Sequence, residues 1–176
     1  MDLGRTLRGA AAGGLAAATW AAQQPVDRRV FGYPFSDVEL LGKLVTRGPG
    51  WPAAGFAMHV GNGAAFGALY ATLGPRLPGP PIARGLLAAM AEHLGSWPLT
   101  AVSDRLHPAR EELPPLAGRP RAFFQATWRH VLFGVVLGLL EERLNRPAPD
   151  PPADPEAVPA ATNGHGRIES AAVSSA

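Results

Sequence analysis

The sequence predicts an all-α protein, a bundle of four membrane-spanning helices with a short interfacial helix in the first loop. Four segments lack charge over most of their length, and each is close to the roughly 20 residues that cross about 30 Å of hydrocarbon. Charged residues make up only 17% of the 176-residue chain, against roughly 25% in ordinary soluble domains. The segment from Ala53 to Leu73 carries no charge on any face when its histidine is neutral, which is typical of a buried or lipid-facing helix.

The expected spans cover residues 3–22, 53–73, 82–103 and 121–144. None is a clean leucine-rich stretch, so a soluble alanine-rich bundle is the structural alternative. Arg5 and Arg8 before a short apolar run resemble a signal peptide, but the cleavage region is poor and a retained first helix is favoured. Aromatic residues at one end of all four spans indicate an interfacial belt. Its tryptophans are Trp20, Trp51, Trp97 and Trp128, joined by Phe31, Tyr33, Phe35, Phe56, Phe123 and Phe124.

The loops differ in length and composition. In the first loop, residues 23–52, Ser36 and Glu39 have the spacing of a capping box, which predicts a short helix over Asp37 to Thr46 in the headgroup region. Residues 74–81 (GPRLPGPP) form a stiff turn. Residues 1–146 are expected to make one membrane domain. Residues 147–176 are rich in proline and alanine and are expected to be a disordered tail.

The two halves of this domain are similar in sequence, which indicates an internal repeat. The segments HVGNGAAFGAL, from His59, and HVLFGVVLGLL, from His130, both fit His-Val-x-x-Gly-x-x-x-Gly-x-Leu. Because the second and fourth spans would run in the same direction, the pattern predicts two parallel helical-hairpin repeats. Four-residue spacing places each histidine on one ridge with two glycines, where small residues let helices approach closely. The helix-packing glycines are Gly63, Gly67, Gly134 and Gly138.

Polar residues within these spans form a candidate polar seam. An Arg129–Glu92 pair on neighbouring helices is expected to offset the cost of a charge in the membrane, roughly 2.5 to 3.5 kcal/mol at its centre. Snorkelling of Arg129 toward the aromatic end and a proton or substrate relay are the alternatives. Trp97-Pro98 is expected to kink the third span, because proline removes a helical hydrogen bond. The seam consists of His59, Asn62, Glu92, His93, Arg129 and His130.

The repeated histidines have two interpretations. They either hydrogen-bond across helices, or His59 and His130 ligate one haem iron from opposite sides. The chain has no cysteine and no HExxH spacing, so no other metal site is expected. It also lacks the GxSxG, P-loop and Rossmann patterns, so no catalytic residues are assigned and the protein is expected not to be an enzyme. The net charge of +2 comes from scattered arginines and does not favour nucleic-acid binding.

Two features of the second span are similar to those of a known group of proteins: the histidine near its start and the GALYA sequence at its end, Gly67–Ala71. Over residues 3–144 the chain resembles the small uncharacterised four-helix integral membrane proteins of GC-rich bacteria. That group carries no assigned activity, so the resemblance implies a fold and a location alone.

The expected function is therefore that of a non-enzymatic, multi-pass protein of the cell membrane with a structural or accessory role. Its expected partners are the lipid bilayer and, in a homo-oligomer, further copies of the chain. A small transporter or proton-linked permease subunit and a haem-binding electron carrier are the alternatives. Basic residues are spread too evenly over the two sides to fix the orientation.

Overall fold

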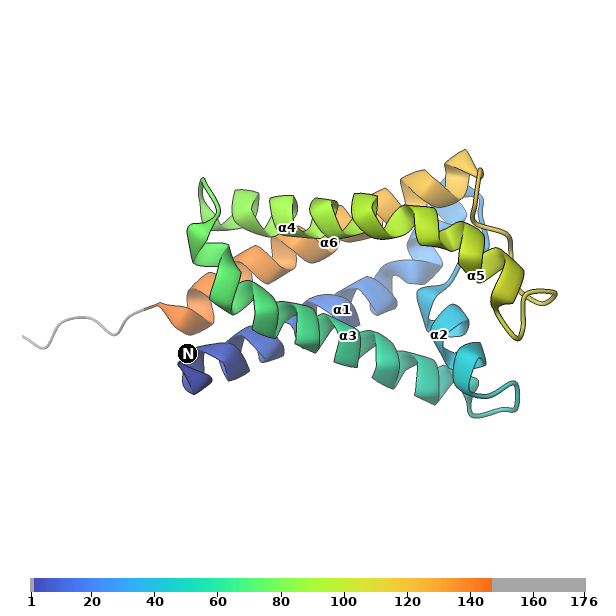
Figure 1. Ribbon diagram of the computed structural model, residues 1–176, viewed down its shortest axis with the longest axis horizontal. Coiled ribbons are helices and arrows are strands. Elements are labelled where there is room, and N and C mark those ends of the chain that lie inside the picture. The colour runs from blue at the N-terminus through green and yellow to red at the C-terminus, as the bar shows by residue number, and fades with distance from the viewer. Residues whose placement is uncertain (1, 147–176) are drawn as a thin grey trace, which may run out of the picture. The chain divides into compact units, whose positions relative to one another are not determined.

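The computed structural model describes residues 2–146, and this part of the chain is all-helical, as the sequence predicts (Figure 1). The expected tail, residues 147–176, lies outside the described residues. The elements are α1 (Leu3–Phe31), α2 (Asp37–Val45), α3 (Trp51–Leu73), the 3₁₀ turn η1 (Gly74–Arg76), α4 (Pro81–Ser96), the 3₁₀ turn η2 (Trp97–Leu99), α5 (Thr100–Leu106) and α6 (Pro120–Asn145).

Helix α1 is longer than the sequence predicts. It continues past the expected end at residue 22, through Pro25, and stops only at Gly32, whose positive φ of 58° ends the helix. The helix therefore includes residues that the sequence analysis assigned to the first loop. Tertiary contacts outweigh the cost of one proline, since Gln24 and Asp27 in the added turns are buried and hydrogen-bonded.

The short helix in the first loop is present as α2. The Ser36 hydroxyl accepts a hydrogen bond from the Glu39 backbone N–H at 3.2 Å, the capping contact that the spacing predicts. Helix α2 lies directly on the start of α3. A Cβ atom on Gly42 would be 2.0 Å from the Trp51 carbonyl oxygen, and one on Gly55 would be 1.8 Å from the Val38 carbonyl oxygen. Only glycine permits this approach.

Helices α1 and α3 cross through glycine backbones. A Cβ atom on Gly13 would be 2.0 Å from the Gly63 carbonyl oxygen, and one on Gly67 would be 2.2 Å from the Gly9 carbonyl oxygen. The residues singled out on α3, Gly63 and Gly67, therefore lie in the contact with α1.

Helices α4 and α6 make the same kind of contact. A Cβ atom on Gly134 would be 2.8 Å from the Gly85 carbonyl oxygen, and one on Gly138 would be 2.4 Å from the Pro81 carbonyl oxygen. Each half thus contains one glycine-lined helix pair, and α1 also packs along α6. In Figure 1, α3 and α4 diverge from the η1 turn, with α1 behind α3 and α6 behind α4. The parallel repeat itself stays a prediction.

The third expected span, residues 82–103, is divided. Helix α4 ends at Ser96, the η2 turn contains Pro98, and α5 continues to Leu106. Pro98 has no N–H to donate, which accounts for the tighter turn at the predicted kink.

The expected aromatic belt is wrong in part. Trp20 is 7% exposed and Phe35 is 5% exposed, so both belong to the interior and do not contact a membrane interface. Trp128 remains at the surface, with 46% of its area exposed. The spacing along the chain places these residues at one end of the molecule but does not say which way they point.

One described helix, α6, is both long enough and apolar enough to cross a membrane, and such a single helix is weak evidence for a membrane location. Glycine, proline and polar residues lower the hydropathy of α1 and α3, and α4 has only 16 residues. Hydropathy of the described helices therefore does not support the expected multi-pass arrangement.

Candidate functional site

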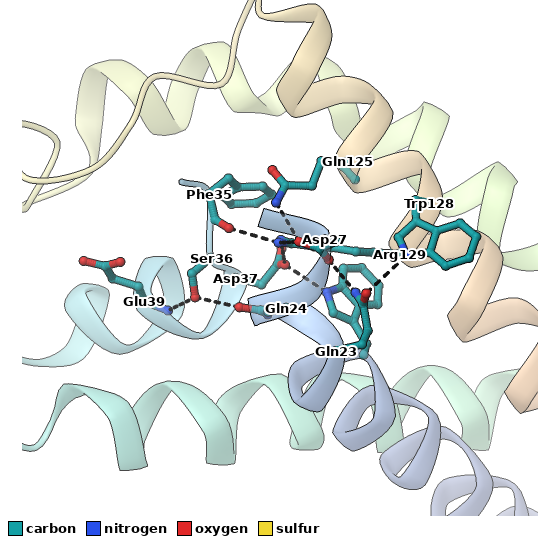
Figure 2. A network of polar contacts seen from close by, with 12 residues as sticks. Gln23, Gln24, Asp27, Phe35, Ser36, Asp37, Glu39, Gln125, Trp128 and Arg129 are labelled. Carbon is teal, nitrogen blue, oxygen red and sulfur yellow. Dashed lines mark hydrogen bonds and ion pairs between the residues drawn. The ribbon is translucent and has the colours of Figure 1, made fainter. Parts of the chain in front are cut away.

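A buried ionic cluster joins α1, α2 and α6 around the guanidinium of Arg129 (Figure 2). Its Nε donates to Asp27 Oδ2 at 2.7 Å and its Nη2 donates to Asp27 Oδ1 at 2.7 Å, which is a bidentate pair. Its Nη1 donates to Asp37 Oδ2 at 2.6 Å, and Nη2 also donates to the Phe35 carbonyl at 2.9 Å. The Arg129 side chain is 0% exposed and that of Asp27 is 1% exposed.

The neighbouring side chains complete this cluster. Gln125 donates to Asp27 Oδ1 at 2.7 Å, and Gln23 donates to Asp27 Oδ2. The indole N–H of Trp20 donates to Asp37 Oδ2 at 2.9 Å. Every oxygen of Asp27 thus accepts at least two hydrogen bonds, as a buried carboxylate requires.

The cluster has one guanidinium for two carboxylates. Arg129 compensates one negative charge, and the other remains at Asp37, whose side chain is 18% exposed. Within residues 2–146, Asp37 Oδ1 makes no hydrogen bond. The excess negative charge is therefore located at the edge of the cluster, where α2 begins.

The expected Arg129–Glu92 pair is wrong. Arg129 binds Asp27 and Asp37, while Glu92 Oε2 lies 2.8 Å from His130 Nε2. Asp27 was overlooked because the helix was predicted to end before it, which placed it in a loop. The signal that could have found it is the four-residue spacing of Gln23 and Asp27, which puts two polar side chains on one helix face.

His130 and Glu92 form a hydrogen-bonded pair. The Ala126 carbonyl lies 2.7 Å from His130 Nδ1, and because a carbonyl only accepts, Nδ1 carries a hydrogen. Glu92 Oε2 lies 2.8 Å from Nε2, so the second ring nitrogen faces the carboxyl group.

The repeated histidines meet at one aromatic side chain. The ring of Trp20 packs edge-on against His59, with centroids 5.1 Å apart, and against His130, with centroids 4.6 Å apart. His93 lies beside His130 at 4.5 Å between centroids, and its Nε2 contacts the Thr127 hydroxyl at 2.9 Å. With Glu92 on His130, the structure thus brings four of the six seam residues together and adds Trp20, which the sequence analysis assigned to the belt.

Trp20 and the three histidines line a cleft of about 310 Å³. Residues of α1, α2, α3, α4 and α6 contribute to its lining, and its aromatic walls include Trp20, Phe66, Trp97 and Phe133. Arg129 of the predicted seam lies outside the lining, in the cluster. The charged, histidine, amide and hydroxyl side chains that line the cleft are Asp37, His59, Asn62, Glu92, His93, Ser96, Thr100 and His130.

The haem interpretation of His59 and His130 stays a prediction. In this structure the indole of Trp20 packs edge-on against both imidazoles. Both nitrogens of His130 also face protein oxygen atoms. Among residues 2–146, no group of three or more His, Cys, Asp or Glu side chains has metal-binding geometry.

A charged tether holds α2 to the loop that precedes α6. Glu112 accepts hydrogen bonds from Arg47 and pairs with Lys43 at 3.1 Å, and His107 Nε2 contacts the Leu40 carbonyl at 2.9 Å. The hydrogen bond from Arg47, followed by that from Lys43, lowers the pKa of the Glu112 carboxyl. The hydrogen bond to Glu39 raises the pKa of the Lys43 ammonium. The tether thus connects the helix that begins at Asp37 to the loop before α6.

The arrangement places an unbalanced carboxylate, a hydrogen-bonded histidine–glutamate pair and aromatic walls around one cavity. No protein-family model, no curated protein and no solved structure matches this chain.

Proposed function

We propose that the protein is a non-enzymatic integral membrane protein with a structural or accessory role, in which α1, α3, α4 with α5, and α6 are four spans of the cell membrane. The observation that carries this proposal is an inverted distribution of polarity. The charged residues Arg129 and Asp27 are among the largest fully buried side chains. Large apolar side chains are exposed on the outer faces of the long helices, including Leu15, Phe56, Leu69, Leu87, Leu94 and Leu139.

Helix length supports the same proposal. At about 1.5 Å per residue, the 29 residues of α1, the 23 of α3 and the 26 of α6 each exceed the roughly 30 Å of a hydrocarbon core. The outer face of α3 carries no charged residue along its length. One interior histidine and several interior glycines lower its mean hydropathy without contacting lipid, because His59, Gly63 and Gly67 are buried.

The glycine contacts support two parallel helical hairpins. In a membrane, apolar side chains gain little free energy when they exchange contact with lipid for contact with another helix. Close packing of the helix backbones therefore drives helix association. The α1–α3 and α4–α6 pairs both use it. The structural role that follows is the formation of a compact bundle with its polar groups turned inward.

The proposal is tested by membrane fractionation of the full chain. After expression, the protein should remain in the pellet through a wash with alkaline carbonate and should leave it only with detergent. A tagged variant with Phe56→Glu and Leu87→Glu, which places two charges on outer faces, should insert less well than the matched Phe56→Leu and Leu87→Ile variant. Recovery of a monodisperse chain from the aqueous fraction would contradict the proposal.

A small transporter or proton-linked permease subunit is the second candidate function. The observation that favours it is the 2.8 Å contact between His130 Nε2 and Glu92 Oε2 at the wall of the cleft, since ionisable residues inside membrane proteins commonly serve proton relays. Reconstituted liposomes with an imposed pH gradient should then show proton flux that Glu92→Gln abolishes. The control is Glu142→Gln, which removes an exposed carboxylate at the other end of α6. Equal flux in both variants and in empty liposomes would exclude this candidate.

A further inference from the structure

We propose that the cleft between α3 and α4 binds a small organic ammonium ion, a primary or secondary amine that carries an apolar group. This goes beyond the proposed membrane role and does not depend on it. Two polar groups that contact the same indole, together with a cavity of matching size, carry the inference: a carboxylate with uncompensated charge and a buried histidine nitrogen without a partner.

The first group is the free carboxylate oxygen of Asp37. One guanidinium serves two carboxylates in the cluster, so a negative charge is left over at the carboxylate that lines the cleft. All the Asp37 contacts in residues 2–146 go to Oδ2, from Arg129 and Trp20. Oδ1 therefore has no donor among the described residues and is accessible from outside the protein. A cation in the cleft would compensate the excess charge and donate to this oxygen.

The second group is His59. Its residue is 7% exposed, and its Nε2 is buried without a hydrogen-bond partner in the described part of the chain. Unpaired buried polar atoms are uncommon in folded proteins, and each one costs free energy unless something binds it. His59 lines the same cleft as Asp37. Because Nε2 has almost no accessible surface, the imidazole must turn toward the cleft before an amine N–H donates to it. A quaternary ammonium ion has no N–H to donate.

Trp20 brings these two groups into one place. Its indole N–H donates to Asp37 at 2.9 Å, and its ring packs at 5.1 Å from the His59 ring. The bound ammonium would therefore lie beside an aromatic ring, where cation–π attraction adds to the charge. Phe66 and Phe133 continue the wall, with ring centroids 5.5 Å apart, and would contact the apolar group of the amine.

The shape and charge of the cleft select against other ligands. Its volume of about 310 Å³ is at the lower end of ligand pockets, roughly 300 to 1,000 Å³, and suits a molecule with one aromatic ring or a short alkyl chain. An anion would meet the unbalanced charge of Asp37 and the carboxyl group of Glu92. A neutral alcohol could donate one hydrogen bond but would not compensate the charge.

The test uses benzylammonium as the probe, with benzyl alcohol and benzoate as its neutral and anionic analogues. Binding to the full chain in dodecyl maltoside micelles is measured by isothermal titration calorimetry, with protein-free micelles subtracted. Benzylammonium should bind saturably, and the two analogues should give no saturable heat. Asp37→Asn should weaken binding roughly tenfold or more, because a charged hydrogen bond is lost. Glu142→Gln, which removes one carboxylate away from the cleft, should leave binding unchanged.

A second variant protects the test against misfolding. His59→Leu removes the free Nε2 but leaves all contacts of Arg129 in place, and it should weaken benzylammonium binding about threefold to tenfold. Absence of saturable binding by the folded chain, equal binding of benzyl alcohol, or unchanged affinity in both cleft variants would overturn the proposal. A chain that binds benzylammonium but needs no detergent would contradict the membrane role alone. A membrane-embedded chain that does not bind it would contradict this inference alone.

Discussion

Replacing Arg129 should be the most destabilising polar substitution in the bundle. Arg129→Gln removes the positive charge that two carboxylates face, and Asp27, 1% exposed, would be left in the interior without compensation. Removal of one partner from a buried ion pair costs about 3 to 5 kcal/mol, and we expect a loss in that range. Asp27→Asn should cost less, about 1 to 3 kcal/mol, because Arg129 keeps Asp37 as its counter-ion.

The assay is a double-mutant cycle on the free energy of unfolding. The chain is unfolded by titration with SDS in mixed micelles and followed by circular dichroism. The Arg129→Gln and Asp27→Asn double variant should be about 2 kcal/mol more stable than the sum of the single losses implies, since residues in one network couple by roughly 0.5 to 3 kcal/mol. Glu92→Gln should add to Arg129→Gln within about 0.5 kcal/mol, because Glu92 pairs with His130. Additive behaviour of Arg129 with Asp27, or strong coupling with Glu92, would refute the assigned pairing.

Three further predictions follow from the packing and the charges. Gly13→Ala would place a Cβ atom 2.0 Å from the Gly63 carbonyl oxygen and should destabilise the fold by about 1 to 3 kcal/mol in the same SDS titration. A Cβ atom on Gly61 would have no neighbour within 4 Å, so Gly61→Ala should be neutral or should stabilise α3 by about 0.5 to 1 kcal/mol. His59→Leu and His130→Leu should have non-additive effects on stability, coupled by about 0.5 to 3 kcal/mol, because both rings pack on Trp20; simple additivity contradicts this. The folded pKa of Glu112 lies below its unfolded value, so its tether is present above about pH 4.3 and is lost as the pH falls through the lowered folded pKa. A nitroxide attached at Val45 should become more mobile as the pH falls through this range, and in the Glu112→Gln variant it should be mobile already at neutral pH. Unchanged nitroxide mobility in both experiments would contradict the tether.

The helical class, the short α2 helix and the kink at Pro98 follow from local signals in the sequence. Ser36 and Glu39 determine the start of α2, and the proline explains η2. The end of α1 could not be predicted in the same way. Its last turns are stabilised by the contacts of Asp27 with Arg129 and Gln125, which are about 100 residues away in sequence.

The sequence points to several residues of the candidate site but does not say which of them form ion pairs with one another. Sequence spacing places His59 and His130 on glycine ridges, and both line the cleft, yet it contains no information about which carboxylate Arg129 binds. The position of Trp20 likewise could not be predicted from sequence spacing. Its position at a helix end suggests a surface belt, whereas the excess carboxylate of Asp37 attracts its indole N–H into the interior.

Lipid exposure of the outer faces tests the central claim most directly. Because the chain has no cysteine, single cysteines can be placed at Phe56, Leu87 and Leu139, which are exposed, and labelled with a nitroxide after reconstitution in liposomes. Electron paramagnetic resonance then compares collisions with oxygen, which concentrates in lipid, and with a water-soluble nickel complex. An inverted membrane bundle predicts high oxygen and low nickel accessibility at all three positions, whereas high nickel accessibility there would contradict it.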